Sequence, residues 1–144
     1  MIPIGFMLWG FARDMVVSRS MTGVIIVSLA FILLVGLAVA SVCGYMAGLI
    51  GASNSPISGV GILVVLVAAL LIKLTYGAVG GGETVKLVAY TLFTASIVFG
   101  IATISNDNLQ DLKTGQLVGS TPWKQQVALI IGVIFGSAII PPVM

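Results

Sequence analysis

An apolar run from Ser20 to Ile72 contains no charged side chain and is the strongest constraint in the sequence. A helix of about 20 apolar residues crosses the roughly 30 Å hydrocarbon core of a bilayer, so this run is long enough for two crossings. Charged residues make up 7% of the chain, whereas a soluble domain has about a quarter. So few charges cannot cover a surface that faces water. The sequence therefore predicts an integral membrane protein.

Four apolar segments are predicted to be helical spans. They cover residues 21–50, 56–76, 85–104 and 126–144. The six bases and four acids lie mostly between these segments or at their ends, as is typical of loops and membrane boundaries. The stretch 105–125 is the one truly polar interval, and we expect it to be a solvated loop in which Gly115 and Gly119 supply turns. The predicted fold class is an all-α membrane protein with about four transmembrane helices, which form part of a bundle.

Small residues recur at every fourth position of the first span. They are Gly36, Ala40, Gly44 and Gly48. Helices in lipid associate through close backbone contact, and small residues at this spacing form a groove for a second helix. We expect this face to be a helix-packing surface. Gly132 and Gly136 repeat the spacing in the fourth span.

A cluster of Gly, Ser, Asn and Pro residues, GASNSPISG at 51–59, interrupts the long apolar run. Gly51 is suited to end the first helix, because glycine adopts the left-handed conformation freely. Asn54 or Ser55 can cap the next helix, with Pro56 at its first position. One interpretation of the cluster is a tight hairpin at a membrane face.

The other interpretation is a helix break that lines a cavity, as in transporters with discontinuous helices. Such a break must face protein or water, because unpaired backbone groups cannot be satisfied in lipid. The composition favours neither interpretation. Under the second one, the candidate substrate-binding residues are Ser53, Asn54, Ser55, Pro56, Ser58 and Gly59.

Several kinds of chemistry are absent from the sequence. The chain has no histidine, which excludes Ser–His catalysis and histidine-based zinc sites. No acidic pair falls inside a predicted span, so an aspartyl mechanism lacks its residues. Cys43 is the single cysteine, and Lys73 is interpreted as a lysine that extends its ammonium to the interface rather than as a proton-coupling group. We predict no catalytic residue, no metal site, no cofactor and, at a net charge of +2, no nucleic-acid partner.

Two polar blocks carry a resemblance to a known family. They read GASNSPISGVGIL (51–63) and SNDNLQDLKTGQLVGSTPWKQQVALIIGVIFGSAIIPP (105–142). The sequence resembles the oligopeptide transporter (OPT) family, in its bacterial branch related to the yellow-stripe-like metal-chelate transporters. The order and spacing of LQDLKTG, STP and QQ are the most specific part. The resemblance implies a secondary active symporter of the bacterial inner membrane, which takes up oligopeptides or peptide-like metal chelates together with protons.

Members of this family have two related halves with many more helices than four. The resemblance therefore implies that the chain is a piece of the second half, with the lipid bilayer and the remaining helices as its partners. The apolar end of the chain agrees with this expectation. Carried over by position, the second motif marks Asp111, Lys113, Thr114 and Gly115. The alternative is a small four-helix membrane assembly or a pore-forming protein, which the glycine faces permit.

Overall fold

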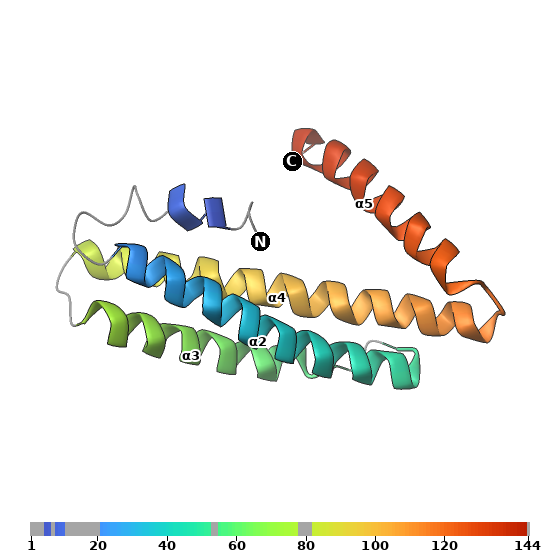
Figure 1. The fold of residues 1–144 in the computed structure, drawn as a ribbon, viewed down its shortest axis with the longest axis horizontal. Coiled ribbons are helices and arrows are strands. Elements are labelled where there is room, and N and C mark those ends of the chain that lie inside the picture. Colours follow the sequence, from blue (N-terminus) through green and yellow to red (C-terminus); the bar gives the residue numbers. More distant parts are fainter. Residues whose placement is uncertain (1–4, 7, 11–20, 53–54, 78–81, 144) are drawn as a thin grey trace.

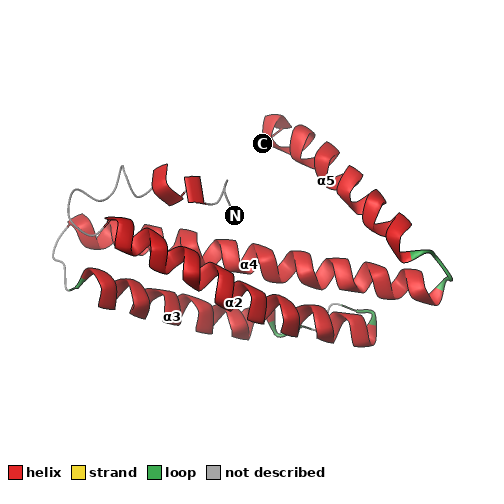
Figure 2. Cartoon of the chain, in the orientation of Figure 1, coloured by secondary structure: helices red, strands yellow, loops and turns green. Residues whose placement is uncertain are grey.

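The computed structural model is helical in nearly all of the part that it describes, and no strand is present there (Figure 2). It describes residues 5–6, 8–10, 21–52, 55–77 and 82–143. The long helices are α2 (Met21–Ile50), α3 (Ile57–Tyr76), α4 (Gly82–Leu117) and α5 (Pro122–Val143). The predicted all-α fold class is confirmed.

Helices α2, α3 and α4 lie side by side, and α5 turns back from the end of α4 at an angle (Figure 1). α3 runs antiparallel to both of its neighbours. The core lies between these three helices, with one further residue from the N-terminal segment. Its buried members are Leu8, Val24, Phe31, Ile32, Val64, Ala68, Ile72, Tyr90, Ala95 and Val98. α5 contacts only α4 among the long helices, and none of its described side chains is buried.

All four long helices have the length and composition needed to cross a membrane. The candidate spans are Gly23–Ile50, Ile57–Thr75, Thr84–Leu117 and Pro122–Ile140. Many large apolar side chains on these helices are exposed, for example Leu74 and Leu34. An exposed apolar surface of this extent suits a lipid or protein environment rather than water.

The small-residue face of α2 packs on α4, so the predicted helix-packing surface is confirmed. A Cβ atom added at Gly44 would lie 2.6 Å from Ser105 Oγ, and one added at Gly36 would lie 3.1 Å from Ile101 Cδ1. The two helices approach this closely because glycine leaves the space open. The Ser105 hydroxyl also donates a hydrogen bond across the interface to the carbonyl oxygen of Ala40, at 2.8 Å.

The glycines that repeat this spacing on α5 are not packed against another helix among the described residues. A Cβ atom added at Gly132 would meet no atom within 4 Å, and one added at Gly136 would meet only Ile140 of the same helix. The glycine face of α5 is thus open among the described residues.

The prediction that residues 105–125 form a polar loop is mostly wrong. α4 continues to Leu117 and α5 begins at Pro122, so that only residues 118–121 link the two helices. Gly115, expected in a turn, lies inside α4. Hydropathy separates polar from apolar residues but does not separate a polar helix from a loop. Here the apolar half of α4 has already formed the helix, so the polar residues extend it without a new nucleation step.

The end of α4 is set by Gly119, which has a φ of 75°. The N–H of Ser120 donates to the carbonyl oxygen of Gly115 at 2.8 Å, and the N–H of Gly119 donates to that of Gln116 at 3.3 Å. This pair of hydrogen bonds is the Schellman motif, which requires a residue that tolerates positive φ. The turn expected at Gly119 is therefore confirmed, and the next helix begins at Pro122, four residues before the predicted span.

A buried hydrogen bond joins α2 to α4 inside the apolar core. The Tyr90 hydroxyl donates to Ser28 Oγ at 3.1 Å, and both side chains are buried. We expect Tyr90→Phe to lower the free energy of unfolding by about 0.6 kcal/mol, the average for side-chain hydrogen bonds between membrane helices. Unfolding by sodium dodecyl sulfate in bicelles, followed by circular dichroism, measures this change. Tyr45→Phe is the control, because the Tyr45 side chain is exposed; an equal loss in both variants would contradict the prediction.

Candidate functional site

The connection between α2 and α3 is the first part of the candidate site. α2 ends at Gly51, which has a φ of 72° and whose N–H donates to the carbonyl oxygen of Ala47 at 2.8 Å. The glycine cap predicted here is confirmed. Pro56, expected as the first residue of the next helix, is instead the residue before it, because α3 begins at Ile57. Ser53 and Asn54 lie outside the described residues.

Ser55 does not cap α3, which has no side-chain hydrogen bond at its N-terminus. Its hydroxyl instead faces the bundle, within hydrogen-bonding distance of two acceptors, the carbonyl oxygen of Cys43 at 3.1 Å and Oδ1 of Asn106. Cys43 lies about two helical turns before the end of α2. The chain therefore runs back along α2 before α3 begins.

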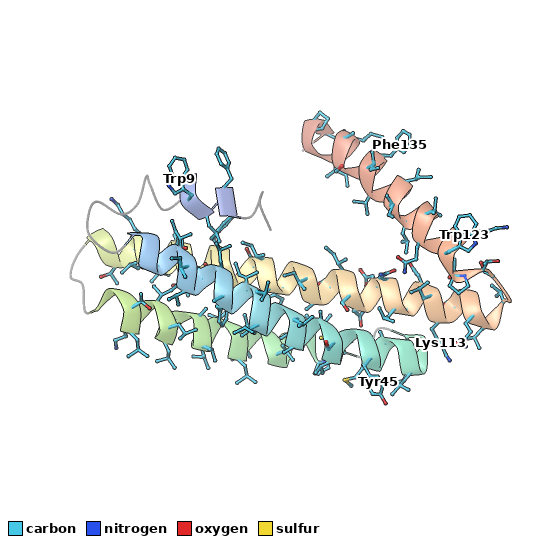
Figure 3. The ribbon with its side chains drawn as sticks, in the orientation of Figure 1. Trp9, Tyr45, Lys113, Trp123 and Phe135 are labelled. Atoms are coloured by element: carbon cyan, nitrogen blue, oxygen red, sulfur yellow. The ribbon has the colours of Figure 1, made fainter. Side chains whose placement is uncertain are left out.

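The same segment also runs back along α4. At its start, a Cβ atom added at Gly51 would lie 3.3 Å from Cγ of Lys113. At its end, Ser55 contacts Asn106, about two turns nearer the start of α4. Figure 3 shows Lys113 at the end of the bundle where α2 finishes. The structure thus places Gly51 and Ser55, two described residues of this connection, against the polar half of α4.

Asn106 is the central residue of this contact, with an exposed fraction of 1%. Its Nδ2 atom donates to Oδ1 of Asp107 at 3.2 Å, and the Asp107 side chain is exposed. The neighbouring Ser105 hydroxyl donates to the carbonyl oxygen of Ala40. Polar side chains from two elements therefore bind main-chain oxygens on successive turns of α2. This arrangement satisfies polar groups inside an apolar bundle, where unpaired groups are costly.

The remaining described residues of the first motif are not brought into this contact. Pro56, Ser58 and Gly59 are exposed. A Cβ atom added at Gly59 would meet no atom within 4 Å. Of the described candidates in this motif, only Ser55 contacts the polar half of α4.

The second motif divides between two faces of α4. Lys113 packs its stem near Gly51, and its ammonium donates to Oε1 of Gln116 at 3.1 Å. Gly115 is buried on another side, where the side chain of Gln125 from α5 occupies the space that a Cβ atom would take. The other two motif residues, Asp111 and Thr114, are exposed.

The sequence analysis did not identify Asn106 or Ser105 as contact residues, because both fell in the expected loop. One signal for Ser105 was present: with Ile101 and Leu109 it repeats the four-residue spacing of the glycines on α2. Two matching four-residue patterns indicate two helix faces that pack together. No comparable signal identifies Asn106 as the partner of Ser55.

A hollow of about 300 Å³ lies between the end of α3 and the start of α4, at the end of the bundle opposite the α2–α3 connection. Lys73 borders this hollow, lies in the last turn of α3 and is exposed. An exposed lysine at a helix end can extend its ammonium to the aqueous interface, which agrees with the interpretation of Lys73 made from the sequence. Within the described ranges, no group of three or more His, Cys, Asp or Glu residues is placed to hold a metal ion.

Comparison with known proteins identifies the family. The family of OPT oligopeptide transporter proteins matches residues 1–144. A relative from Haemophilus influenzae, named "Putative oligopeptide transporter", is 58% identical over 114 residues. The matched region is 76% of this chain but only 18% of that relative. No solved structure matches the chain. The match along the whole sequence and the four long apolar helices show that this chain is an integral, multi-pass membrane protein that belongs to the OPT oligopeptide transporter family.

Proposed function

We propose that this chain forms part of a secondary active symporter of the bacterial inner membrane. The transporter moves oligopeptides, or peptide-like metal chelates, together with protons. Membership of the OPT family and the name of the Haemophilus influenzae relative support peptide transport. Because the matched region is 18% of that relative, we propose that the complete pathway also uses helices from the rest of a longer transporter.

The observation that carries this proposal is the contact between Ser55 and Asn106. It holds non-helical backbone against the polar half of a long helix. In a membrane, such backbone is tolerated only where protein or water covers it. Transporters use breaks of this kind to bind substrates and ions, because the free backbone groups and helix ends are polar.

We assign the substrate-contacting role to the connection between α2 and α3 and the first turn of α3. The residues are Ser53, Asn54, Ser55, Pro56, Ser58 and Gly59. Their hydroxyl and amide groups can pair with the N–H and C=O groups of a peptide, since each kind of group donates or accepts hydrogen bonds. The side chains of Asp111, Lys113 and Thr114 lie further along α4, where we propose that they belong to the polar surface next to this path.

Asn54→Ala tests this assignment in the full-length transporter that contains this chain. We expect the variant to take up labelled tripeptide about three- to tenfold more slowly, because one hydrogen bond contributes roughly 0.5–1.5 kcal/mol. The measurement uses proteoliposomes with and without an inward pH gradient, and parallel samples receive an iron chelate. Ser96→Ala is the control, since Ser96 is exposed on the apolar half of α4. Unchanged uptake by a correctly inserted Asn54→Ala protein would contradict a lining role for Asn54.

A further inference from the structure

A small cavity lies in the core of the bundle, where α2, α3 and α4 meet. The space open to the centre of a water molecule is about 10 Å³, close to the minimum that holds one water. Two buried hydroxyl groups border the cavity, those of Ser28 on α2 and Thr94 on α4. An entirely apolar cavity would stay dry, so the content of this one depends on the two hydroxyls. The rest of its wall is formed by Val27, Phe31, Ala68, Leu71 and Ile72.

The Ser28 hydroxyl has a hydrogen that finds no acceptor in the described part of the chain. Serines inside helices often donate to a carbonyl oxygen one turn earlier, as Ser41 and Ser96 do here. Ser28 instead accepts a hydrogen bond, from the Tyr90 hydroxyl at 3.1 Å. With an exposed fraction of 2%, Ser28 is also shielded from bulk water. A buried donor that stays unpaired is costly.

Thr94 has the complementary group. Its hydroxyl donates its single hydrogen to the carbonyl oxygen of Tyr90 at 2.9 Å, so its oxygen keeps a lone pair that can accept a hydrogen bond. The exposed fraction of Thr94 is 1%. The same cavity is therefore bordered by a free donor at Ser28 and a free lone pair at Thr94. One water molecule can accept from the first residue and donate to the second.

The cavity lies next to a route from the membrane surface. Ile72 borders both the cavity and the hollow of about 300 Å³ beside Lys73. On α4 the hollow reaches Thr91, and Thr94 lies one turn further into the bundle. Thr94 is about 15 Å along α4 from Thr84, where the candidate span begins. Water can therefore approach the cavity through the hollow without crossing the apolar outer faces of the helices.

We propose that this cavity is a binding site for a water molecule, held by Ser28 and Thr94. Buried waters make roughly two to four hydrogen bonds to polar groups that otherwise lack partners, and these two hydroxyls supply a donor and an acceptor. The water would join α2 to α4 beside the hydrogen bond between Tyr90 and Ser28. It would also extend the polar lining of the hollow by one helical turn into the bundle. The site does not depend on which substrate the transporter moves.

Radiolytic labelling of frozen samples tests this proposal, because radicals that cannot diffuse oxidise only the side chains next to a water molecule. The full-length transporter that contains this chain is frozen in detergent and irradiated with X-rays, and oxidised residues are located by mass spectrometry. Phe31 is the reporter, since it borders the cavity and is only 5% exposed. We expect oxidation of Phe31 in the unmodified protein and its loss in Ser28→Ala. Thr94→Val should cause the same loss, and it keeps the test available if Ser28→Ala does not fold.

Thr103→Val is the matched control for these variants. Thr103 also donates to a carbonyl oxygen of its own helix, but its side chain is exposed and does not border the cavity, so Phe31 should be oxidised as in the unmodified protein. A packing defect acts in the opposite direction from a lost water, because a loosened core admits more water and raises the oxidation of Phe31.

Two results would overturn the proposal. One is an unoxidised Phe31 in the unmodified protein, a reading that needs no variant. The other is oxidation of Phe31 that neither Ser28→Ala nor Thr94→Val reduces. The measurement does not use transport, so a failure of peptide uptake would count against the proposed function and leave the water site standing.

Discussion

Replacing Gly44 by leucine is expected to force α2 away from α4 and to lower the free energy of unfolding by about 3 kcal/mol, the upper part of the range for overpacked interiors. A Cβ atom at this position would lie 2.6 Å from Ser105 Oγ and 3.3 Å from Leu109 Cγ. Ser105 cannot simply turn away, because its hydroxyl is bonded to the carbonyl oxygen of Ala40. The helix backbones must therefore separate, which also breaks that hydrogen bond. Unfolding of the chain by sodium dodecyl sulfate in bicelles measures the loss.

Gly132→Leu is a matched control for this prediction. Gly132 belongs to the same kind of four-residue repeat, but a Cβ atom there would meet nothing within 4 Å. Leucine also has a higher helix propensity than glycine. We expect the stability of this variant in the 144-residue chain to be unchanged or slightly increased. Equal destabilisation by Gly44→Leu and Gly132→Leu would show that the α2–α4 contact is not the source of the effect.

These two glycines also show how far the sequence predicts packing. A four-residue spacing of small residues identifies a face that can receive a helix, and it did so correctly for α2. It does not identify the partner, because any helix of suitable shape can occupy the groove. It also does not say whether the groove is filled within the same chain: the glycine face of α2 meets α4, whereas that of α5 is open among the described residues.

The polar half of α4 shows a different limit. Ser105, Asn106, Asp107 and Asn108 are all weak helix formers, and a run of them is typical of a loop. Tertiary contacts outweigh this preference, since Ser105 binds the main chain of α2 and Asn106 binds Ser55. These contacts come from residues far away in the sequence. Local propensity cannot anticipate them, whereas the turn at Gly119 follows from local glycine chemistry and was predicted.

Only part of the candidate site could be predicted, again because local sequence features do not reveal contacts between distant residues. The two polar blocks stand out from an apolar background, so composition alone indicates them. That they touch, and that Ser55 and Asn106 form the hydrogen-bonded part of the contact, depends on the chain reversing direction between Gly51 and Ser55. A reversal of about two helical turns leaves no mark on hydropathy. It follows from the packing of α2 and α3 against a common helix.

A double-mutant cycle on Ser55 and Asn106 is expected to show the contact as a measurable coupling energy. Asn106→Ala should lower the free energy of unfolding by about 2–3 kcal/mol, because it removes a fully buried side chain with its hydrogen bonds. Ser55→Ala should lower it by about 1 kcal/mol. The double variant should lose less than the sum by roughly 0.6–1.7 kcal/mol, the range found for hydrogen-bonded pairs between membrane helices.

The pair formed by Ser96→Ala and Asn106→Ala provides the reference for this cycle. Ser96 donates to the carbonyl oxygen of Phe93 in its own helix, so its effect should add to that of Asn106→Ala within about 0.5 kcal/mol. If the Ser55 pair is equally additive, the connection between α2 and α3 is not held by this contact. A coupling confined to Ser55 and Asn106 would instead mean that the non-helical segment is fixed to α4 by one polar pair. A break that is fixed by a single pair can be released by breaking that pair, which is the property that a moving part of a transporter requires.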